Sequence, residues 1–270
     1  MYKRLTTVII FSLFLFTAQI LPAQDDKLDS LDFSIEGSPM KEQKPPYFAV
    51  AGGYLGTFLY VNFSDLNKHL LDNNFGLGEL KAPLFLSGAE GFAAIVLIPN
   101  VRVGFFGMAG SKLLENNIMV AGQSVKRSLD YSVALNGLAI DYAFTPFKSF
   151  AIIPGVNLGW GSLSIDNYQT QDNFNWNNFN TNGSDTVNYY KSAKTVFSYV
   201  QPNLNIEYAL TPFTVIRASV GYAYSFSLFS KDWEWYYDKN AKIPSGSSLD
   251  KVKASGMTLQ IGLFVGLFNY

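Results

Sequence analysis

"LNIEYALTPFTVIRASVGY", residues 204–222, consists of two alternating runs on either side of Thr211-Pro212. Even-numbered positions are apolar apart from Pro212 and Thr214, whereas many odd-numbered positions are polar residues or glycine. A period of two predicts two β-strands joined by a tight turn, each strand having two unlike faces. In a soluble protein the apolar face would form the core, whereas in a bilayer it would face lipid and the polar face would line the interior.

The composition favours the second environment. The chain is 48% hydrophobic and 16% aromatic, but only 15% of its residues are charged. Beyond the first 23 residues, no stretch has the 18 or so consecutive apolar residues that a membrane-spanning helix needs. The net charge of −1 offers no basic field for nucleic acid, and the chain contains no cysteine for disulfides. A β-barrel in an outer membrane combines these properties.

The first residues have the plan of a secretory signal peptide. Lys3 and Arg4 precede an apolar run, and Ala23 is the small residue after which we expect cleavage. The apolar run is shorter than the roughly 20 residues of a spanning helix, although an N-terminal membrane anchor is the alternative. We therefore expect a signal peptide at 1–23, a disordered periplasmic lead-in at 24–46 and an outer-membrane β-barrel at 47–270, with an interaction peptide as the alternative for 24–46.

Strand signals recur eight times along the rest of the chain. The expected strands are 47–63, 84–98, 101–111, 126–144, 150–165, 194–210, 213–230 and 253–269. Tight turns at 99–100, 145–149 and 211–212 alternate with connections of roughly 15 to 30 residues. Short turns at one end and long loops at the other predict an up-and-down meander, with the turns and both chain ends in the periplasm.

The residues on the two strand faces indicate which face is inside. The expected apolar faces of the last four strands carry no charge, and the opposite faces are rich in glycine, serine and asparagine. Small residues suit the narrow interior of an eight-stranded barrel, so we expect the apolar faces to meet lipid. Because proline lacks a ladder donor, bulges are expected at Pro154 and Pro202. A further bulge near Asn136-Gly137 would explain why the apolar positions of 126–144 change from odd to even.

Four charges interrupt this uncharged interior. Each lies on an expected inward face near a tight turn, and the set is Arg102, Asp141, Glu207 and Arg217. A closed lumen cannot hold unpaired charges. We expect a salt-bridge network that plugs the barrel, with an ion gate or proton path as the alternative.

These features together resemble the small outer-membrane β-barrel superfamily, the OmpA/OmpX-like barrels. The resemblance covers 47–270 and rests on the signal peptide, the eight amphipathic strands, the alternation of turns and loops, and the terminal "LFVGLFNY". It implies insertion by the outer-membrane barrel assembly machinery, which in that family recognises the last strand and its C-terminal aromatic residue. Tyr270 stands where phenylalanine is commoner.

We expect no enzymatic activity, no cofactor and no metal site. His69 is the sole histidine, and Ser64 and Asp65 lie nearby, as some lipid-modifying outer-membrane barrels use a serine and a histidine. Ser64-Asp65 is better interpreted as the N-cap of a short helix with Leu66, Leu70 and Leu71 on its apolar side. Clustered histidine or cysteine ligands are absent from the sequence.

Two expected loops combine aromatic residues with amides and charges. The aromatic residues are Phe174, Trp176, Phe179, Tyr189, Tyr190, Trp233, Trp235, Tyr236 and Tyr237. Exposed aromatics can stack on sugars or anchor a protein, so a surface glycan or an envelope protein is an expected partner. Alternatively, these residues form an aromatic girdle that continues the barrel wall.

The sequence therefore predicts an all-β, eight-stranded antiparallel up-and-down transmembrane barrel in the bacterial outer membrane. The expected function is structural or one of surface interaction. The alternatives are a channel for small solutes or hydrophobic ligands, a lipid-modifying enzyme and a soluble ligand-binding barrel.

Overall fold

The computed structural model describes residues 47–72, 75–120, 122–171, 188–226, 233–237, 241–243, 249 and 252–269. The expected signal peptide at 1–23 and lead-in at 24–46 lie outside this range, as do Phe174, Trp176, Phe179 and Tyr270. No helix in the described part of the chain is both long and apolar enough to cross a membrane.

The described chain is almost entirely β-structure. The long strands are β1 (Phe48–Val61), β2 (Leu84–Ala94), β3 (Val101–Val120), β4 (Gln123–Tyr142), β6 (Phe150–Gln171), β7 (Tyr189–Thr211), β8 (Thr214–Phe226) and β11 (Gly256–Asn269). The short elements are α2 (Ser64–Asp72), β5 (Phe144–Phe147), β9 (Glu234–Tyr237) and β10 (Ala241–Ile243).

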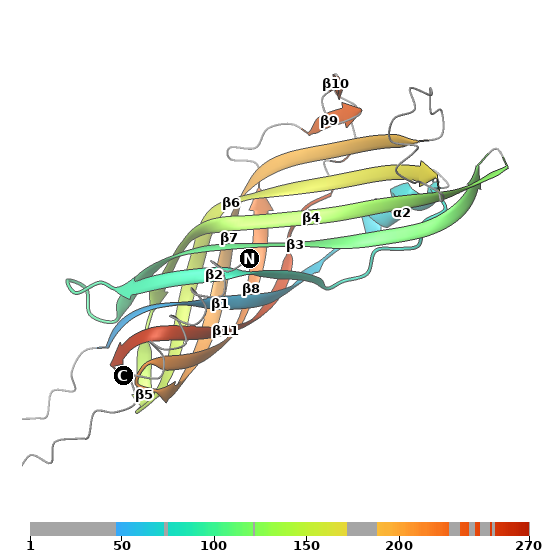
Figure 1. Ribbon diagram of the computed structural model, residues 1–270. Helices are drawn as coiled ribbons and strands as arrows, with labels where there is room; N and C mark the ends of the chain where they lie inside the picture. The colour runs from blue at the N-terminus through green and yellow to red at the C-terminus, as the bar shows by residue number, and fades with distance from the viewer. Residues whose placement is uncertain are drawn as a thin grey trace, which may run out of the picture. The chain divides into compact units, whose positions relative to one another are not determined.

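The eight long strands close into a ring of antiparallel neighbours. Each pairs with the long strand that follows it in the sequence, and the first and last, β1 and β11, pair along their whole length from Phe48↔Asn269 to Val61↔Gly256. Figure 1 shows the meander running from β1 to β11 around the ring. The predicted fold, an eight-stranded antiparallel up-and-down barrel, is confirmed.

One end of the barrel carries tight turns, which are hydrogen-bonded to neighbouring strands. The backbone N–H of Ala143 donates to the carbonyl of Asn100, and that of Ala209 donates to the carbonyl of Ser149. Asn100 and Ser149 both adopt a φ of +66°, a left-handed conformation that asparagine tolerates better than most residues. Each bond therefore fixes a turn to the end of a neighbouring strand.

The apolar faces of the strands lie on the outside of the ring. In the hairpin of β7 and β8, Leu204 and Ile206 are 42% and 44% exposed, whereas the adjacent Glu207 is fully buried. The outward apolar residues on the other strands include Val50, Tyr54, Ile140, Leu158, Leu259, Ile261 and Leu263. The predicted orientation of 204–222, with its apolar face outward, is therefore confirmed.

The connection between β3 and β4 differs from the expected loop. The sequence predicted a strand that ends at residue 111, but β3 continues to Val120 and the pair Val120↔Gln123 closes a long hairpin. The strands β6 and β7 are also longer than expected. Consequently β3, β4, β6 and β7 extend well beyond the ends of the other four long strands (Figure 1). We call this extension the outer wall.

The change of phase within β4 has a different cause from the expected bulge. Pairing of β4 with β3 and with β6 runs without a register shift through Asn136-Gly137, so that expectation was wrong. Inward positions are odd throughout, and Leu129, Tyr131, Val133 and Leu135 are buried inside the outer wall. The apolar residues of β4 change face because the surroundings change: within the outer wall the inside of the sheet is mainly apolar and the outside is mainly polar.

The prolines are also accommodated without the expected bulges. The β6–β7 register is continuous through Pro154↔Leu204 and Val156↔Pro202. On the other edge of each of these strands, the pairing is interrupted at the proline and then resumes in the same register. The interruption lies between Gly155 and Ile152 for Pro154, and between Val200 and Asn203 for Pro202. Each proline is therefore accommodated by the local loss of ladder hydrogen bonds, and no extra residue is inserted as it would be in a bulge.

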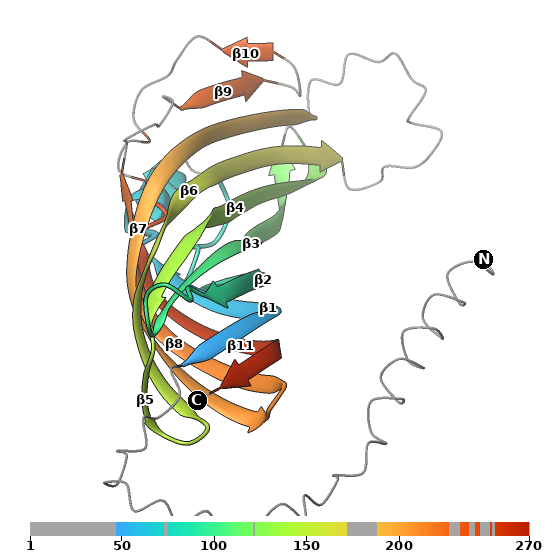
Figure 2. The ribbon, with the colours of Figure 1, turned by 90° about the vertical axis from the view of Figure 1, so that its left-hand side faces the viewer.

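The inner face of the outer wall is covered by the segment that follows β1. Helix α2 buries Leu66, and the loop after it buries Leu77 and Leu80. Asn67 holds that loop through two side-chain hydrogen bonds of 2.9 Å, one to the Leu80 carbonyl and one from the Leu80 amide. Figure 2 shows α2 within the curve of the outer wall and β9 alongside β7.

Candidate functional site

The four charges predicted to line the lumen meet near the turn end. Arg102 Nε donates to Asp141 Oδ2 at 2.9 Å, and Arg217 Nε donates to Glu207 Oε1 at 2.8 Å. Both pairs join residues directly opposite each other on adjacent strands. The local register therefore fixes one arginine–carboxylate pair on β3–β4 and another on β7–β8.

Further ion pairs connect strands that are not neighbours. Arg102 Nη1 lies 2.7 Å from Glu207 Oε1, and Arg217 Nη1 lies 2.7 Å from Glu90 Oε1 on β2. The result is a continuous series Asp141–Arg102–Glu207–Arg217–Glu90, in which all five side chains are at least nine-tenths buried. We call these residues the lumen cluster. Its two cations and three carboxylates tie together five strands of the barrel.

Aromatic rings and a glycine fit closely around the lumen cluster. The guanidinium carbon of Arg102 lies 4.3 Å from the centre of the Phe92 ring, and that of Arg217 lies 4.0 Å from the centre of the Phe264 ring. Such contacts stabilise a desolvated cation by roughly 2 kcal/mol. Gly155, opposite Asp141, has no room for a side chain, because a Cβ there would lie 1.8 Å from Asp141 Oδ1.

Sequence reasoning missed two members of this network. Glu90 shares the inward face of β2 with Leu84, Leu86 and Phe92, and Tyr47 accepts a 3.2 Å hydrogen bond from Arg102 Nη1. Both faces of residues 84–94 are made of small or apolar residues, so the alternation there gives little sign of which side is inward. The signal that could have found Glu90 is that it is the sole charged residue of the expected strand 84–98.

The lumen is filled at further levels above the lumen cluster. Gln201 Nε2 donates to Thr258 Oγ1 at 3.0 Å, and the rings of Phe106 and Tyr199 then approach to 6.3 Å between centroids. At the level of the outer wall, Phe63 packs edge-on against Tyr131 at 5.0 Å. Side chains of the described residues thus occupy the interior from the turn end to α2, which supports a plug over an open pore.

The outside of the outer wall is polar. Tyr190 donates to Asp166 Oδ1 at 2.8 Å, and Tyr236 donates to Glu234 Oε2 at 2.7 Å. Partial burial, together with the bond to Asp166, raises the pKa of the Tyr190 phenol, and the bond to Glu234 raises the pKa of Tyr236. Lys194 lies over the Tyr236 ring at 5.8 Å. Hydroxyls, carboxylates and an ammonium group therefore form one continuous outward surface.

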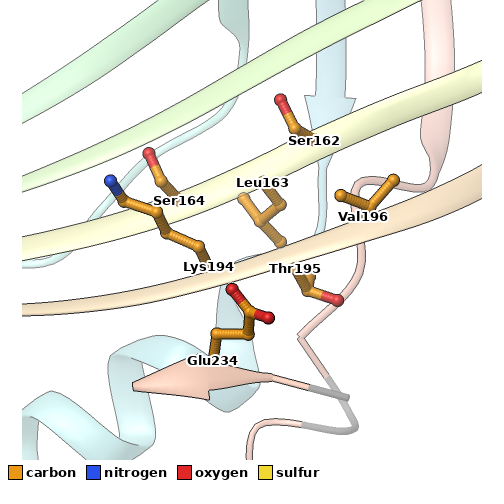
Figure 3. Close-up of a pocket in the computed structure, with 7 residues that line it drawn as sticks. All are labelled: Ser162, Leu163, Ser164, Lys194, Thr195, Val196 and Glu234. Atoms are coloured by element: carbon orange, nitrogen blue, oxygen red, sulfur yellow. The ribbon is translucent and has the colours of Figure 1, made fainter. Parts of the chain in front are cut away.

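An open depression of about 400 Å³ lies within this outward surface. Figure 3 shows its lining: Ser162, Leu163 and Ser164 from β6, Lys194, Thr195 and Val196 from β7, and Glu234 from β9. Both serine hydroxyls project from the same side of β6 in this view. Its lining offers hydrogen-bond donors and acceptors. Among the described residues there is no group of three or more His, Cys, Asp or Glu residues that could hold a metal ion.

The described aromatic residues of the expected loops divide between the two sides of the sheet. Trp235 pairs with the inward Ala193, and Trp233 and Trp235 both pack against the apolar core. Tyr236 pairs with Ser192 and faces outward together with Tyr190. Tyr189 lies opposite the inward Gln169, and Tyr237 lies opposite Lys191. Only part of the predicted set is therefore placed to meet a surface partner.

The predicted short helix near His69 is confirmed, but its start differs from the expectation. α2 begins at Ser64, and the Ser64 backbone N–H and hydroxyl both donate to Asn62 Oδ1. The side chains of His69, Leu70 and Leu71 lie outside the described residues. Ser64, the serine of the hypothetical catalytic pair, is thus hydrogen-bonded to Asn62, which precedes the helix.

Comparison with known proteins identified similar folds only. No protein-family model matches the sequence. No curated protein matches it either. Solved structures of similar fold include a major outer membrane protein from Thermus thermophilus, with 10% identity over 81% of this chain and 99% of that chain and a TM-score of 0.45.

Two further solved structures were found with lower TM-scores. Ail, the attachment invasion locus protein of Yersinia pestis, solved with the heparin analogue sucrose octasulfate, has 9% identity over 83% of this chain and 99% of its own, with a TM-score of 0.33. The outer membrane protease OmpT from Escherichia coli has 9% identity over 82% of this chain and 95% of its own, with a TM-score of 0.35.

The strand pairing and side-chain orientation define the class of protein. The chain forms a closed antiparallel barrel of eight strands, apolar on the outside and filled with polar, aromatic and aliphatic side chains on the inside.

Proposed function

We propose that the protein is an integral outer-membrane barrel with a closed lumen, which binds a carbohydrate surface through the outer wall and carries out no chemistry. The observation that carries this proposal is the change of the outward face, along single strands, from apolar to polar. On β6 the outward residues run from Phe150 through Leu158 and Trp160 to Ser162, Ser164 and Asp166.

The apolar part of β6 matches the thickness of a membrane. From Phe150 to Trp160 the strand advances about 33 Å at roughly 3.3 Å per residue, which covers about 25 Å at a tilt of roughly 40°. Exposed aromatic residues border the apolar band at both edges: Tyr142, Phe147, Tyr208 and Phe213 at the turn end, and Tyr60, Trp160, Tyr222 and Tyr224 at the other. Such girdles are typical of barrels at membrane interfaces.

The remaining half of β6 would then stand in water outside the membrane. Its outward residues join those of β7 and β9 in the surface of Asp166, Tyr190, Lys194, Glu234 and Tyr236. Sugar hydroxyls donate hydrogen bonds to carboxylates and exchange them with side-chain hydroxyls, and the sugar ring contacts aromatic rings. The outer wall combines these groups on a rigid sheet, which is the basis for proposing a glycan partner.

Membrane orientation is tested by labelling single cysteines, because the natural chain has none. Thr170→Cys lies at the exposed far end of β6, and Lys148→Cys lies in an exposed turn at the opposite end. A membrane-impermeant maleimide should label Thr170→Cys in intact cells and Lys148→Cys only after the outer membrane is opened. Labelling of both in intact cells, or recovery of the protein in a detergent-free soluble fraction, would contradict the proposal.

Glycan binding is tested with the purified protein in nanodiscs on an array of immobilised bacterial surface polysaccharides. Tyr236→Ala should weaken binding at least tenfold, because the residue faces outward beside Lys194 and Glu234. Tyr237→Ala is the matched control, since this exposed neighbour lies on the opposite face of the strand. An array without signal, or equal losses in the two variants, would argue against a glycan partner at this surface.

A further inference from the structure

A small apolar pocket lies on the inner side of the outer wall, between the sheet and α2. Its volume is about 120 Å³, and its lining includes Leu66 and Phe75 from the β1–β2 segment, Leu129 from β4 and Ile165 from β6. The rest of the lining is Asn167 on β6, Lys191, Ser192 and Ala193 on β7, Trp235 on β9, and Leu249. The pocket is thus assembled from parts of the chain that are far apart in the sequence.

Three residues of the lining carry a buried polar atom without a hydrogen-bond partner, and because Ser192 faces outward with Tyr236, Asn167 and Trp235 are the two on the inner side. Asn167 Oδ1 and Trp235 Nε1 are both inaccessible to solvent and unbonded, and the Asn167 side chain belongs to a residue that is only 9% exposed. Leaving a buried donor or acceptor unsatisfied costs about 1–3 kcal/mol. Two such atoms on one pocket indicate that a bound molecule supplies the missing partners: a donor for Asn167 Oδ1 and an acceptor for Trp235 Nε1.

The strand register places both residues on the inward face of the sheet. Asn167 lies opposite Lys191 of β7, while Trp235 lies opposite Ala193, two residues further along the same strand. β6 and β9 flank β7, so the two backbones are about 10 Å apart across the strands. The carbonyl oxygen and the indole N–H can therefore approach one bound group from two sides.

We propose that this pocket binds a small apolar alcohol or phenol. A hydroxyl group is the smallest group that can donate to Asn167 Oδ1 and accept from Trp235 Nε1 at once. The volume is of the order of the cavity of about 150 Å³ that holds a benzene molecule in an engineered protein core. Leu66, Phe75, Leu129 and Ile165 enclose the apolar part of the ligand.

The indole signals of the protein provide a site-specific test. The chain has four tryptophans, and Trp235→Phe identifies the Trp235 signal in a spectrum of protein labelled with ¹⁵N-tryptophan in nanodiscs. Titration with 4-fluorophenol should shift the Trp235 N–H signal downfield and saturate. Trp160, which is 60% exposed on the outside of the barrel, reports partition of the phenol into lipid and should shift without saturation.

Two variants test the pocket and its polar atoms separately. Ile165→Phe fills the pocket and should abolish the saturable shift, with Ala193→Val as a smaller filling variant should the first fail to fold. Asn167→Leu should weaken 4-fluorophenol binding about tenfold and leave fluorobenzene binding unchanged. A Trp235 signal that does not saturate, or saturates equally in the filled variants, would overturn the proposal; equal effects of Asn167→Leu on both probes would overturn recognition of the hydroxyl.

This pocket and the proposed glycan surface lie on opposite sides of the same sheet. Tyr236 and Lys194 face outward, whereas Trp235 and Ala193 face inward. Failure of glycan binding therefore leaves the pocket proposal standing, and failure of phenol binding leaves the glycan proposal standing.

Discussion

Arg102 Nη1 lies 2.7 Å from Glu207 Oε1, although the two residues stand on β3 and β7, which are not neighbours in the ring. The same Glu207 oxygen accepts from Arg217 Nε at 2.8 Å. One carboxylate oxygen therefore joins two cations that reach it from different sides of the lumen. Because all three side chains are no more than 3% exposed, none of these charges can regain water if the contact is lost.

Replacing the shared carboxylate should have a large effect on stability. Glu207→Gln keeps the shape but leaves two buried arginines without their common counter-charge, and breaking such a pair costs roughly 3–5 kcal/mol. The free energy of unfolding is measured by urea titration of the protein folded into vesicles. Glu115→Gln is the control, because its pair with Lys126 is more than a third exposed and contributes about 0–1 kcal/mol. Equal losses would show that the lumen cluster is not a stabilising network.

Gly155 should not tolerate a side chain. Gly155→Ala would place a Cβ against Asp141 Oδ1 and displace the carboxylate from Arg102, with an expected loss of roughly 1–3 kcal/mol. Gly91→Ala provides a comparison within the barrel, since its nearest neighbour would be 3.8 Å away. Unfolding titrations of the two variants should differ clearly. If Gly155→Ala behaves like Gly91→Ala, the close packing of β6 against Asp141 is incorrect.

A charge on the outside of β6 should be costly below Trp160 and harmless above it. Leu158→Lys puts an ammonium group on the proposed lipid-facing band at a cost of up to about 2–4 kcal/mol. Ser164→Lys makes a comparable change on the same face of the same strand, within the outer wall, where surface substitutions usually change stability by about 0.5 kcal/mol or less. Folding yields in vesicles and urea midpoints report both. Similar penalties for the two variants would place the membrane boundary elsewhere.

The filled lumen should make the protein electrically silent. The lumen cluster, Gln201–Thr258 and Phe106–Tyr199 cross the described interior at successive levels, so we expect ions to find no water-filled path through it. Planar bilayers containing the natural protein should show no steps above the background of protein-free bilayers. Stable unitary steps that change in Arg102→Ala or Glu207→Ala would support the alternative of a small-solute channel.

The sequence was sufficient for the strands that contact the proposed membrane, because on most of them the two faces differ clearly. It was insufficient for residues 112–120 of β3, where leucine, methionine, asparagine and glutamate follow one another without a clear alternation. The phase change in β4 was noticed but misread, because the interpretation assumed one environment along the whole strand. In fact Leu138 and Ile140 point outward, whereas Leu135 and Val133 point inward, on an unbroken ladder.

The sequence predicted only part of the lumen cluster, because a charge stands out only on a strand whose two faces differ. Arg102, Asp141, Glu207 and Arg217 stand out because they interrupt faces of small residues, and the structure brings all four together. Glu90 escaped notice because its own strand has two similar faces. The pocket beside Asn167 could not be predicted, since it depends on the position of α2 and β9 relative to a sheet that extends beyond the barrel.

The pairing of β1 with β11 has a consequence for assembly. These strands are the first and last of the ring, and every residue from Phe48 to Val61 has its partner on β11. Closure therefore joins the two strands that are furthest apart in the sequence of the barrel. Because closing so long a loop costs much conformational entropy, this contact is expected to form late in folding. Until it forms, β1 and β11 each expose a row of unpaired amides and carbonyls. An unclosed barrel therefore has two strand edges that can pair with strands of a neighbouring chain.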